Sequence, residues 1–191
     1  AWLASEFGVR VEESAAETLA ADVVVLAVKP QQLSALLRGL PPLEPGQLVL
    51  SIAAGVRALD ISRWLGGHAA VARAMPNTPA LVGAGITGLY ALPTVSETQK
   101  VQARQVLEAV GEVAWVDDES LIDAVTAISG SGPAYVFLFI EALEQAAIDL
   151  GLPAATARQL TLHTFLGAAA LAIKDRAPPA ELRARVTSKG G

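Results

Sequence analysis

Apolar residues are distributed differently in the two halves of the chain. In residues 1 to about 116, short apolar runs alternate with segments whose apolar residues recur at helical spacing. Runs rich in Val, Leu, Ile and Ala are typical of strands buried on both faces of a parallel sheet. The strands that this pattern predicts are residues 22–28, 48–53, 70–75, 85–90 and 113–116.

Helical patterns fill the intervals between these strands. Ser96 and Gln99 have the spacing of a capping box, and the segment after them has its apolar residues on one helical face. Strands that alternate with helices indicate βαβ units. The first half is therefore predicted to be a doubly wound parallel sheet of the α/β class.

From residue 119 to residue 185 the pattern contains no strand. The predicted helices are residues 119–129, 133–150, 153–174 and 179–185. A Gly-Ser-Gly-Pro sequence at 130–133 is expected to break the first two helices, with Ser131 as N-cap and Pro133 near the first turn. The predicted domains are residues 1–117, a sheet domain, and residues 118–191, an all-α domain.

The helices of the second half are unusually apolar. Residues 136–140 form an unbroken apolar run, so this helix has no polar face to turn to solvent. Four helices offer little surface to cover it, and a second copy of the chain is the natural cover, which predicts a homodimer through this half. The apolar stretch 124–140 contains two glycines and a proline and is shorter than the ~20 residues of a membrane span, so a buried helix is expected.

Composition narrows the choice of protein class. The 191 residues include 14 Lys+Arg against 19 Asp+Glu, a formal net charge of −5, and 52% are hydrophobic. These values exclude a disordered chain and argue against a partner such as nucleic acid or an anionic membrane. The chain has no cysteine, which excludes a disulfide scaffold and a cysteine-based zinc site and fits a cytoplasmic location. The first residues show no secretory signal.

Three predicted strand ends carry residues suited to binding a ligand, which in open parallel sheets lies at the carboxyl ends of the strands. The first is Ala27-Val28-Lys29-Pro30. Pro30 fits the first turn of a following helix, because it lacks the N–H that would be unpaired there. Lys29 could hold a phosphate, or could simply be a solvated lysine at a turn.

The second and third strand ends differ in chemistry. Ala53-Ala54-Gly55 would let a flat ring approach the backbone, although a plain tight turn has the same pattern. In the run Met75-Pro76-Asn77-Thr78-Pro79, two prolines stiffen a loop that carries two hydrogen-bonding side chains; a stiff connector would also fit.

Other candidate groups are weaker. A Rossmann fingerprint, Gly-x-Gly-x-x-Gly, does not follow strand 22–28, so either no dinucleotide binds or the fingerprint lies before residue 1. His68 and His163 lack metal-ligand spacing, and no metal site is predicted. The acidic run 117–119 is expected to be a solvated turn. Ser188 with the paired glycines Gly190 and Gly191 could form a nest of backbone N–H groups for a carboxylate.

Four motifs together resemble a known family. They are Ala-Val-Lys-Pro at 27–30, Ser-Ile-Ala-Ala-Gly-Val at 51–56, Met-Pro-Asn-Thr-Pro at 75–79 and the block at 121–135 that runs from Leu-Ile-Asp-Ala-Val-Thr to Gly-Ser-Gly-Pro-Ala-Tyr. In this order and spacing the chain resembles pyrroline-5-carboxylate reductases over nearly its whole length. The last block is highly specific, whereas each of the shorter motifs alone is weak.

The resemblance implies an NAD(P)H-dependent oxidoreductase that reduces the cyclic imine 1-pyrroline-5-carboxylate to L-proline, the last step of proline biosynthesis. It implies a Rossmann domain, here partial, and a helical dimerisation domain, with dimers that often assemble into decamers. The implied cofactor-binding residues are Ala27, Val28, Lys29, Pro30, Ala53, Ala54, Gly55, Met75, Pro76, Asn77 and Thr78. The implied substrate-binding residues are Ser188, Gly190 and Gly191. No catalytic residue is singled out.

The chain departs from the family pattern at its ends. Lys189 stands where the family has a proline, and the threonines that follow the paired glycines in the family would lie beyond Gly191. The family's glycine fingerprint would lie upstream of residue 1, so we expect the chain to be truncated at both ends. The residue that separates NADPH from NADH would also lie upstream.

Two alternatives remain at this point. One is a fragment that dimerises without activity. The other is an enzyme like the β-hydroxyacid dehydrogenases, which usually place an acid–base lysine on the long helix between their domains. Residues 130–150 contain no lysine, which argues against the second alternative.

Overall fold

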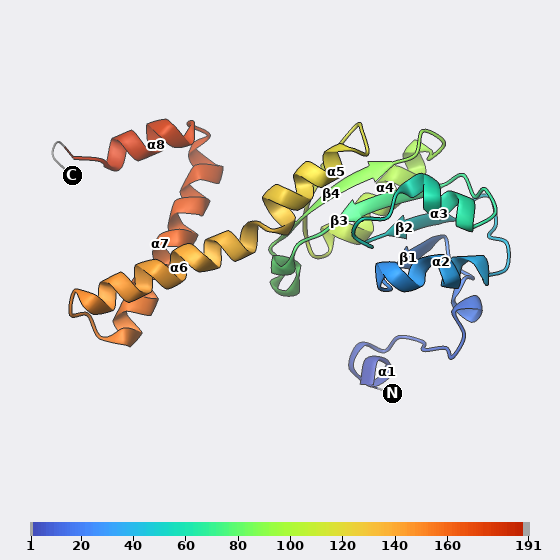
Figure 1. The fold of residues 1–191 in the computed structure, drawn as a ribbon, viewed down its shortest axis with the longest axis horizontal. Helices are drawn as coiled ribbons and strands as arrows, with labels where there is room; N and C mark the ends of the chain where they lie inside the picture. The colour runs from blue at the N-terminus through green and yellow to red at the C-terminus, as the bar shows by residue number, and fades with distance from the viewer. Residues whose placement is uncertain (1, 189–191) are drawn as a thin grey trace. The chain divides into compact units, whose positions relative to one another are not determined.

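The computed structural model describes residues 2–188 and contains one five-stranded sheet followed by a series of helices (Figure 1). The sheet has the order β1-β2-β3-β4-β5. Its strands are β1 (Val23–Leu26), β2 (Leu48–Ser51), β3 (Val71–Met75), β4 (Gly85–Ala91) and β5 (Gly111–Trp115). All five lie where the apolar pattern predicted strands. Before the sheet come a short helix, α1 (Trp2–Phe7), and a 3₁₀ turn, η1 (Ala15–Thr18).

The sheet is mixed rather than wholly parallel. Strands β1, β2 and β3 are parallel, and β5 is parallel to β4, but β4 runs antiparallel to β3. The prediction of a parallel sheet is therefore wrong at β4. The reason is the short link between β3 and β4, which contains only a 3₁₀ turn, η2 (Thr78–Val82), whereas a parallel crossover needs about a dozen residues.

Helices cover both faces of the sheet, as a doubly wound fold requires. Side chains alternate along β2, so that Val49 lies in one core cluster and Leu48 and Leu50 lie in another. The first cluster includes residues of α2 (Pro30–Arg38) and α3 (Ala58–Trp64). The second includes residues of α4 (Glu97–Glu108), which begins with the predicted capping box. Packing in these two clusters fixes the strands, and therefore the positions of the turns that follow them.

The helical pattern continues across the predicted break at 130–133. Helix α5 (Leu121–Val125) passes into a π-helical segment, η3 (Thr126–Gly130), and then into α6 (Gly132–Asp149). Ser131 has helical angles, and its N–H donates to the carbonyl of Thr126 at 2.8 Å, so it is not an N-cap. The residues that were expected to end a helix instead form a π-type turn.

By length and composition, the helical run Leu121–Asp149 could cross a membrane. It has 29 residues, and its most apolar window has a mean hydropathy of 1.3. The prediction that this stretch is too short was wrong, because the glycines and Pro133 do not interrupt it. Core helices of soluble proteins share this length and composition.

The chain forms two compact units, which divide between Pro133 and Ala134. We call them the sheet unit and the helical unit. Helix α5 belongs to the sheet unit, where Val125 packs against Gly88 of β4. The sequence pattern changes at residues 117–118, whereas the two compact units divide about sixteen residues later, after Pro133. The domain boundary at residues 117–118 therefore stays a prediction.

The helical unit contains most of α6, then α7 (Ala154–Asp175) and α8 (Pro179–Val186). Helix α6 buries none of its side chains, and α7 buries only Ala157 and Thr161. Exposed apolar side chains follow both helices: Tyr135, Val136, Phe137, Leu138, Phe139, Leu143, Leu160, Leu162, Leu166, Leu171 and Ile173. A single chain leaves this apolar surface uncovered, as the sequence pattern predicted.

Candidate functional site

The three predicted ligand turns emerge at one edge of the sheet. They follow β1, β2 and β3, which are adjacent and parallel, so their carboxyl ends point the same way. The first two turns also begin side by side, because the N–H of Ile52 donates to the carbonyl of Leu26 at 3.1 Å. The residues predicted to bind a cofactor, from three separate stretches of sequence, are thus brought together.

The turn after β1 leads directly into α2. Pro30 is the first residue of that helix, as predicted, and Lys29 is its N-cap residue. The side chain of Lys29 is exposed and makes no capping hydrogen bond. It is therefore free to reach an anion at the start of the helix, where the dipole also favours negative charge.

The turn after β2 is small and open. Ala53 is buried and its N–H is bound by Ser51 Oγ at 3.3 Å, whereas Ala54 and Gly55 are exposed. Gly55 has φ +73°, a conformation that other residues adopt only with strain. A Cβ added at Gly55 would meet no atom within 4 Å, so this side of the backbone is free to receive a flat group.

The turn after β3 is held by the side chain of Asn77. Its Oδ1 accepts from the N–H of Ile86 at 3.0 Å, and its Nδ2 donates to the carbonyl of Ser129 at 3.1 Å. Asn77 therefore ties the turn to the start of β4 and to the π-helical segment. Thr78 is the exposed hydroxyl of this turn, and Met75 lies close to Gly130, where an added Cβ would approach its Cε to 2.8 Å.

A polar hollow of about 500 Å³ adjoins the turn after β2. Its lining residues are Gly55, Arg57, Arg73, Glu119, Ser120 and Asp123. Of the predicted site residues within 2–188, Gly55 alone lines it. The sequence analysis did not predict that the charged residues of this lining, Arg57, Arg73, Glu119 and Asp123, belong to a site.

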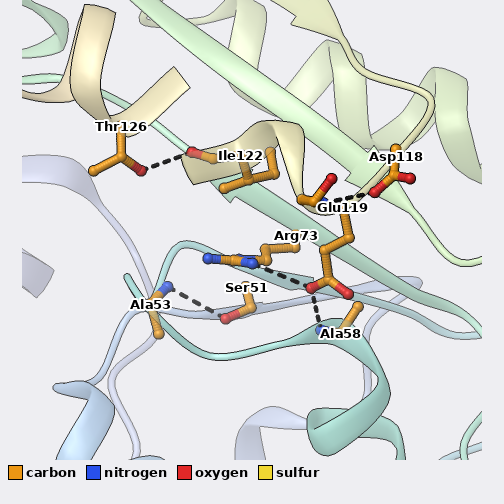
Figure 2. Close-up of polar contacts among 9 residues, drawn as sticks. Ser51, Ala53, Ala58, Arg73, Asp118, Glu119, Ile122 and Thr126 are labelled. Carbon is orange, nitrogen blue, oxygen red and sulfur yellow. Dashed lines mark hydrogen bonds and ion pairs between the residues drawn. The ribbon is translucent and has the colours of Figure 1, made fainter. Parts of the chain in front are cut away.

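Two residues that line this hollow, Arg73 and Glu119, form an ion pair (Figure 2). Arg73, in the middle of β3, is 5% exposed, and its Nη1 lies 3.2 Å from Oε1 of Glu119. The same oxygen accepts from the N–H of Ala58 at 2.7 Å, at the start of α3. The expectation of a solvated acidic turn was wrong for Glu119. An arginine inside an apolar strand was the available signal, because a buried charge requires a partner.

Two neighbouring groups have shifted acidities. Asp118 accepts hydrogen bonds from the hydroxyl and the N–H of Ser120, which lowers the pKa of its carboxyl. Tyr90 lies opposite Arg73 on β4; partial burial and the carboxylates of Glu119 and Asp118 raise the pKa of its phenol. Tyr90 is therefore neutral at physiological pH and offers a hydroxyl rather than a charge.

The remaining sequence candidates lie elsewhere or are structural. Ser188 is exposed and follows α8, while Gly190 and Gly191 lie outside the described residues, so the carboxylate nest stays a prediction. His68 is buried, with a ring nitrogen 2.8 Å from the carbonyl of Gln47. Between residues 2 and 188 no group of three His, Cys, Asp or Glu side chains is placed to hold a metal ion.

Family profiles match both ends of the chain. Residues 119–191 match the family described as pyrroline-5-carboxylate reductase dimerisation. Residues 1–55 match the family described as NADP oxidoreductase, coenzyme F420-dependent. The first of these matches begins near the predicted boundary at 117–118 and covers the apolar helices.

Two bacterial proteins that this chain resembles are named pyrroline-5-carboxylate reductase. The chain is 54% identical to the pyrroline-5-carboxylate reductase of Pseudomonas aeruginosa, over 99% of this chain and 70% of that protein. It is 44% identical to that of Synechocystis, over 100% of this chain and 71% of that protein.

Solved structures agree with the fold. A pyrroline-5-carboxylate reductase from Coxiella burnetii superposes with a TM-score of 0.91 at 45% identity, over 100% of this chain and 72% of that one. The Plasmodium falciparum pyrroline carboxylate reductase, solved with NADP bound, gives a TM-score of 0.85 at 32% identity, over 94% and 69%.

Proposed function

The chain belongs to the pyrroline-5-carboxylate reductase family, and from this premise we propose that it reduces the cyclic imine 1-pyrroline-5-carboxylate to L-proline with NADPH or NADH. The observation that carries the proposal is the meeting of the three strand turns at one edge of the sheet. This reaction is the last step of proline biosynthesis.

The residues at this edge fit a nicotinamide cofactor. The turn after β2 has no side chain larger than a methyl group between Ala53 and Gly55, and the space beside Gly55 is open. A flat ring can therefore lie against the backbone there. The groups proposed to hold the cofactor are those of residues 27–30, 53–55 and 75–78, with Lys29 and Thr78 as their exposed polar side chains.

In the catalysis that we propose, the main task of the protein is to position the cofactor and the imine. The bound nicotinamide supplies a hydride for the imine carbon. An imine that arrives protonated already carries a positive charge, so the reduction needs no strong acid from the protein. The residues of the three turns orient the ring and exclude water on one side, which is consistent with the absence of His and Cys from the proposed site residues.

We place the substrate carboxylate at Ser188, Gly190 and Gly191, whose backbone N–H groups would bind it. The match of residues 119–191 to a dimerisation family and the uncovered apolar helices support association through the helical unit, which we propose to be a homodimer that can build a decamer. A cytoplasmic location and the lack of a nucleic-acid or membrane partner remain predictions from composition.

The proposed cofactor surface is tested by Ala54→Val in the full-length protein. Two added methyl groups on the exposed face of the turn should obstruct the ring, and we expect kcat/KM for NADPH oxidation with pyrroline-5-carboxylate to fall at least tenfold, about 1.4 kcal/mol in transition-state free energy. The absorbance of NADPH reports the rate. The matched control is Ala35→Val on an exposed position of α2, which should keep full activity.

Unchanged kinetics for Ala54→Val, with the control equally active, would remove this turn from the site. A wild-type protein that binds NADPH but does not reduce pyrroline-5-carboxylate would instead refute the proposed reaction. That second result would favour the alternative in which the chain only dimerises.

A further inference from the structure

Arg73 and Glu119 form an ion pair that the proposed reaction does not use. Arg73 lies on β3 with its side chain 7% exposed, and the side chain of Glu119 is 20% exposed. The exposed pairs of this chain are different in kind: Glu97, which pairs with Lys100 on α4, has a side chain that is 87% exposed. A surface pair contributes little, whereas the loss of Glu119 would leave a buried guanidinium without its carboxylate.

One oxygen of Glu119 joins two separate elements. Oε1 lies 3.2 Å from Arg73 Nη1 and accepts from the N–H of Ala58 at 2.7 Å. Ala58 is the first residue of α3, and it is 61 residues away from Glu119 along the sequence. Arg73 fixes the carboxylate over the sheet, and the carboxylate in turn satisfies an N–H group at the start of the helix (Figure 2).

The position of Ala58 matters because the turn after β2 ends there. Residues 52–57 link β2 to α3, and the turn is fixed at its first end by the bond from Ala53 N–H to Ser51 Oγ. The bond from Ala58 to Glu119 fixes its second end. Gly55 lies between the two anchors, with open space where a side chain would be.

We propose that Glu119, held in place by Arg73, is a positioning residue that sets the shape of the Ala53–Gly55 turn for the nicotinamide ring. The inference rests on the proposed cofactor site. Glu119 acts through the backbone at Ala58 and need not touch the cofactor itself. Without it the second end of the turn loses its anchor while the first end stays fixed, and the ring must then order a looser backbone when it binds.

The test uses Glu119→Ala and Glu119→Gln in the full-length protein. The Kd of NADPH is measured by calorimetry, and the exchange of backbone amides in residues 52–60 is measured by mass spectrometry without cofactor. We expect Glu119→Ala to raise the Kd at least tenfold and to speed exchange in residues 52–60. Glu119→Gln keeps an oxygen that can accept from Ala58, so it should raise the Kd no more than about threefold.

Two controls separate positioning from general stability. Leu107→Ala removes a buried side chain of α4 on the other face of the sheet, so it should lower the melting temperature without changing the Kd of NADPH. Glu97→Ala breaks an exposed ion pair and should change neither quantity.

The proposal is overturned if Glu119→Ala binds NADPH as tightly as wild type, or if Leu107→Ala weakens NADPH binding as much as Glu119→Ala does. It is also overturned if the glutamine variant is as impaired as the alanine variant. Failure of the proposed reaction would look different. The wild-type protein would then bind NADPH without reducing the imine, and the differences in NADPH Kd among the variants would still be measurable.

Discussion

The sheet unit and the helical unit differ in how completely each covers its own apolar residues. Side chains such as Leu50, Ile61 and Leu89 in the sheet unit have no exposed area. In the described part of the helical unit, Ala157 is the only apolar residue that is buried, while Phe137, Leu138 and Phe139 are each more than half exposed. The sheet unit therefore buries a core of its own, whereas the described helical unit leaves most of its large apolar side chains exposed.

This difference assigns the two requirements of the proposed enzyme, cofactor binding and subunit association, to different units. The strand turns that would hold the cofactor lie on a core formed within one chain, because α2, α3 and α4 cover both faces of the sheet. The apolar helices have no such cover within one chain. Substitutions in one unit should therefore affect cofactor binding or folding, and substitutions in the other should affect association.

The largest effect is expected for Phe139→Glu on α6. Phe139 is 66% exposed in the single chain, so a glutamate there costs little before association. In a two-fold dimer the change occurs twice and places an unpaired charge in the interface. We expect the dimer Kd to rise about a thousandfold, roughly 4 kcal/mol, as measured by analytical ultracentrifugation.

The matched control for this change is Val101→Glu on α4. Val101 is 52% exposed, so the same kind of charge is placed on an exposed apolar position of the sheet unit. Its sedimentation should equal that of wild type. If both variants dissociate, or if neither does, the interface does not lie on the helical unit as we describe it.

The second prediction compares one substitution in both units. Leu50→Ala removes a fully buried side chain of β2 and should lower the free energy of unfolding by about 3 kcal/mol in urea titrations. Leu138→Ala, at a position 63% exposed, should act through association. Its effect on unfolding should therefore disappear once the protein is diluted below the dimer Kd, whereas the effect of Leu50→Ala should persist at every concentration. Equal concentration dependence of the two would contradict the comparison.

The smallest effect concerns the packing of α5 on the sheet. A Cβ at Gly88 would lie 2.5 Å from Cγ1 of Val125, so Gly88→Ala forces the helix away from β4. We expect a loss of about 2 kcal/mol in the free energy of unfolding. Val125→Ala removes the obstructing methyl groups, so the double variant should be more stable than Gly88→Ala alone. A double variant that is no more stable would show that this contact does not hold α5.

Much of the sheet could be predicted from the sequence because burial on both faces leaves a direct signal. Leu48, Val49 and Leu50 of β2 are consecutive apolar residues and all are buried, which is typical of a strand covered on both faces. Strand ends carry ligands in such folds, and so the three turns could be predicted as well. Their roles in binding remain predictions.

The features that could not be predicted depend on contacts between distant residues. The direction of β4 follows from a short link that local patterning does not reveal. Gly130 and Pro133 usually end helices, but a π-type turn with its bond from Ser131 to Thr126 continues this one. The pairing of Arg73 with Glu119 joins residues 46 positions apart, and only the charge inside an apolar strand hinted at it.

The most direct test of the whole account is an NADPH titration of the Phe139→Glu variant at a concentration where it is monomeric. If the sheet unit carries the cofactor surface by itself, the monomer should bind NADPH with a Kd within about threefold of the wild-type value. Loss of NADPH binding on dissociation would contradict the account, because the three strand turns would then depend on the partner for their shape.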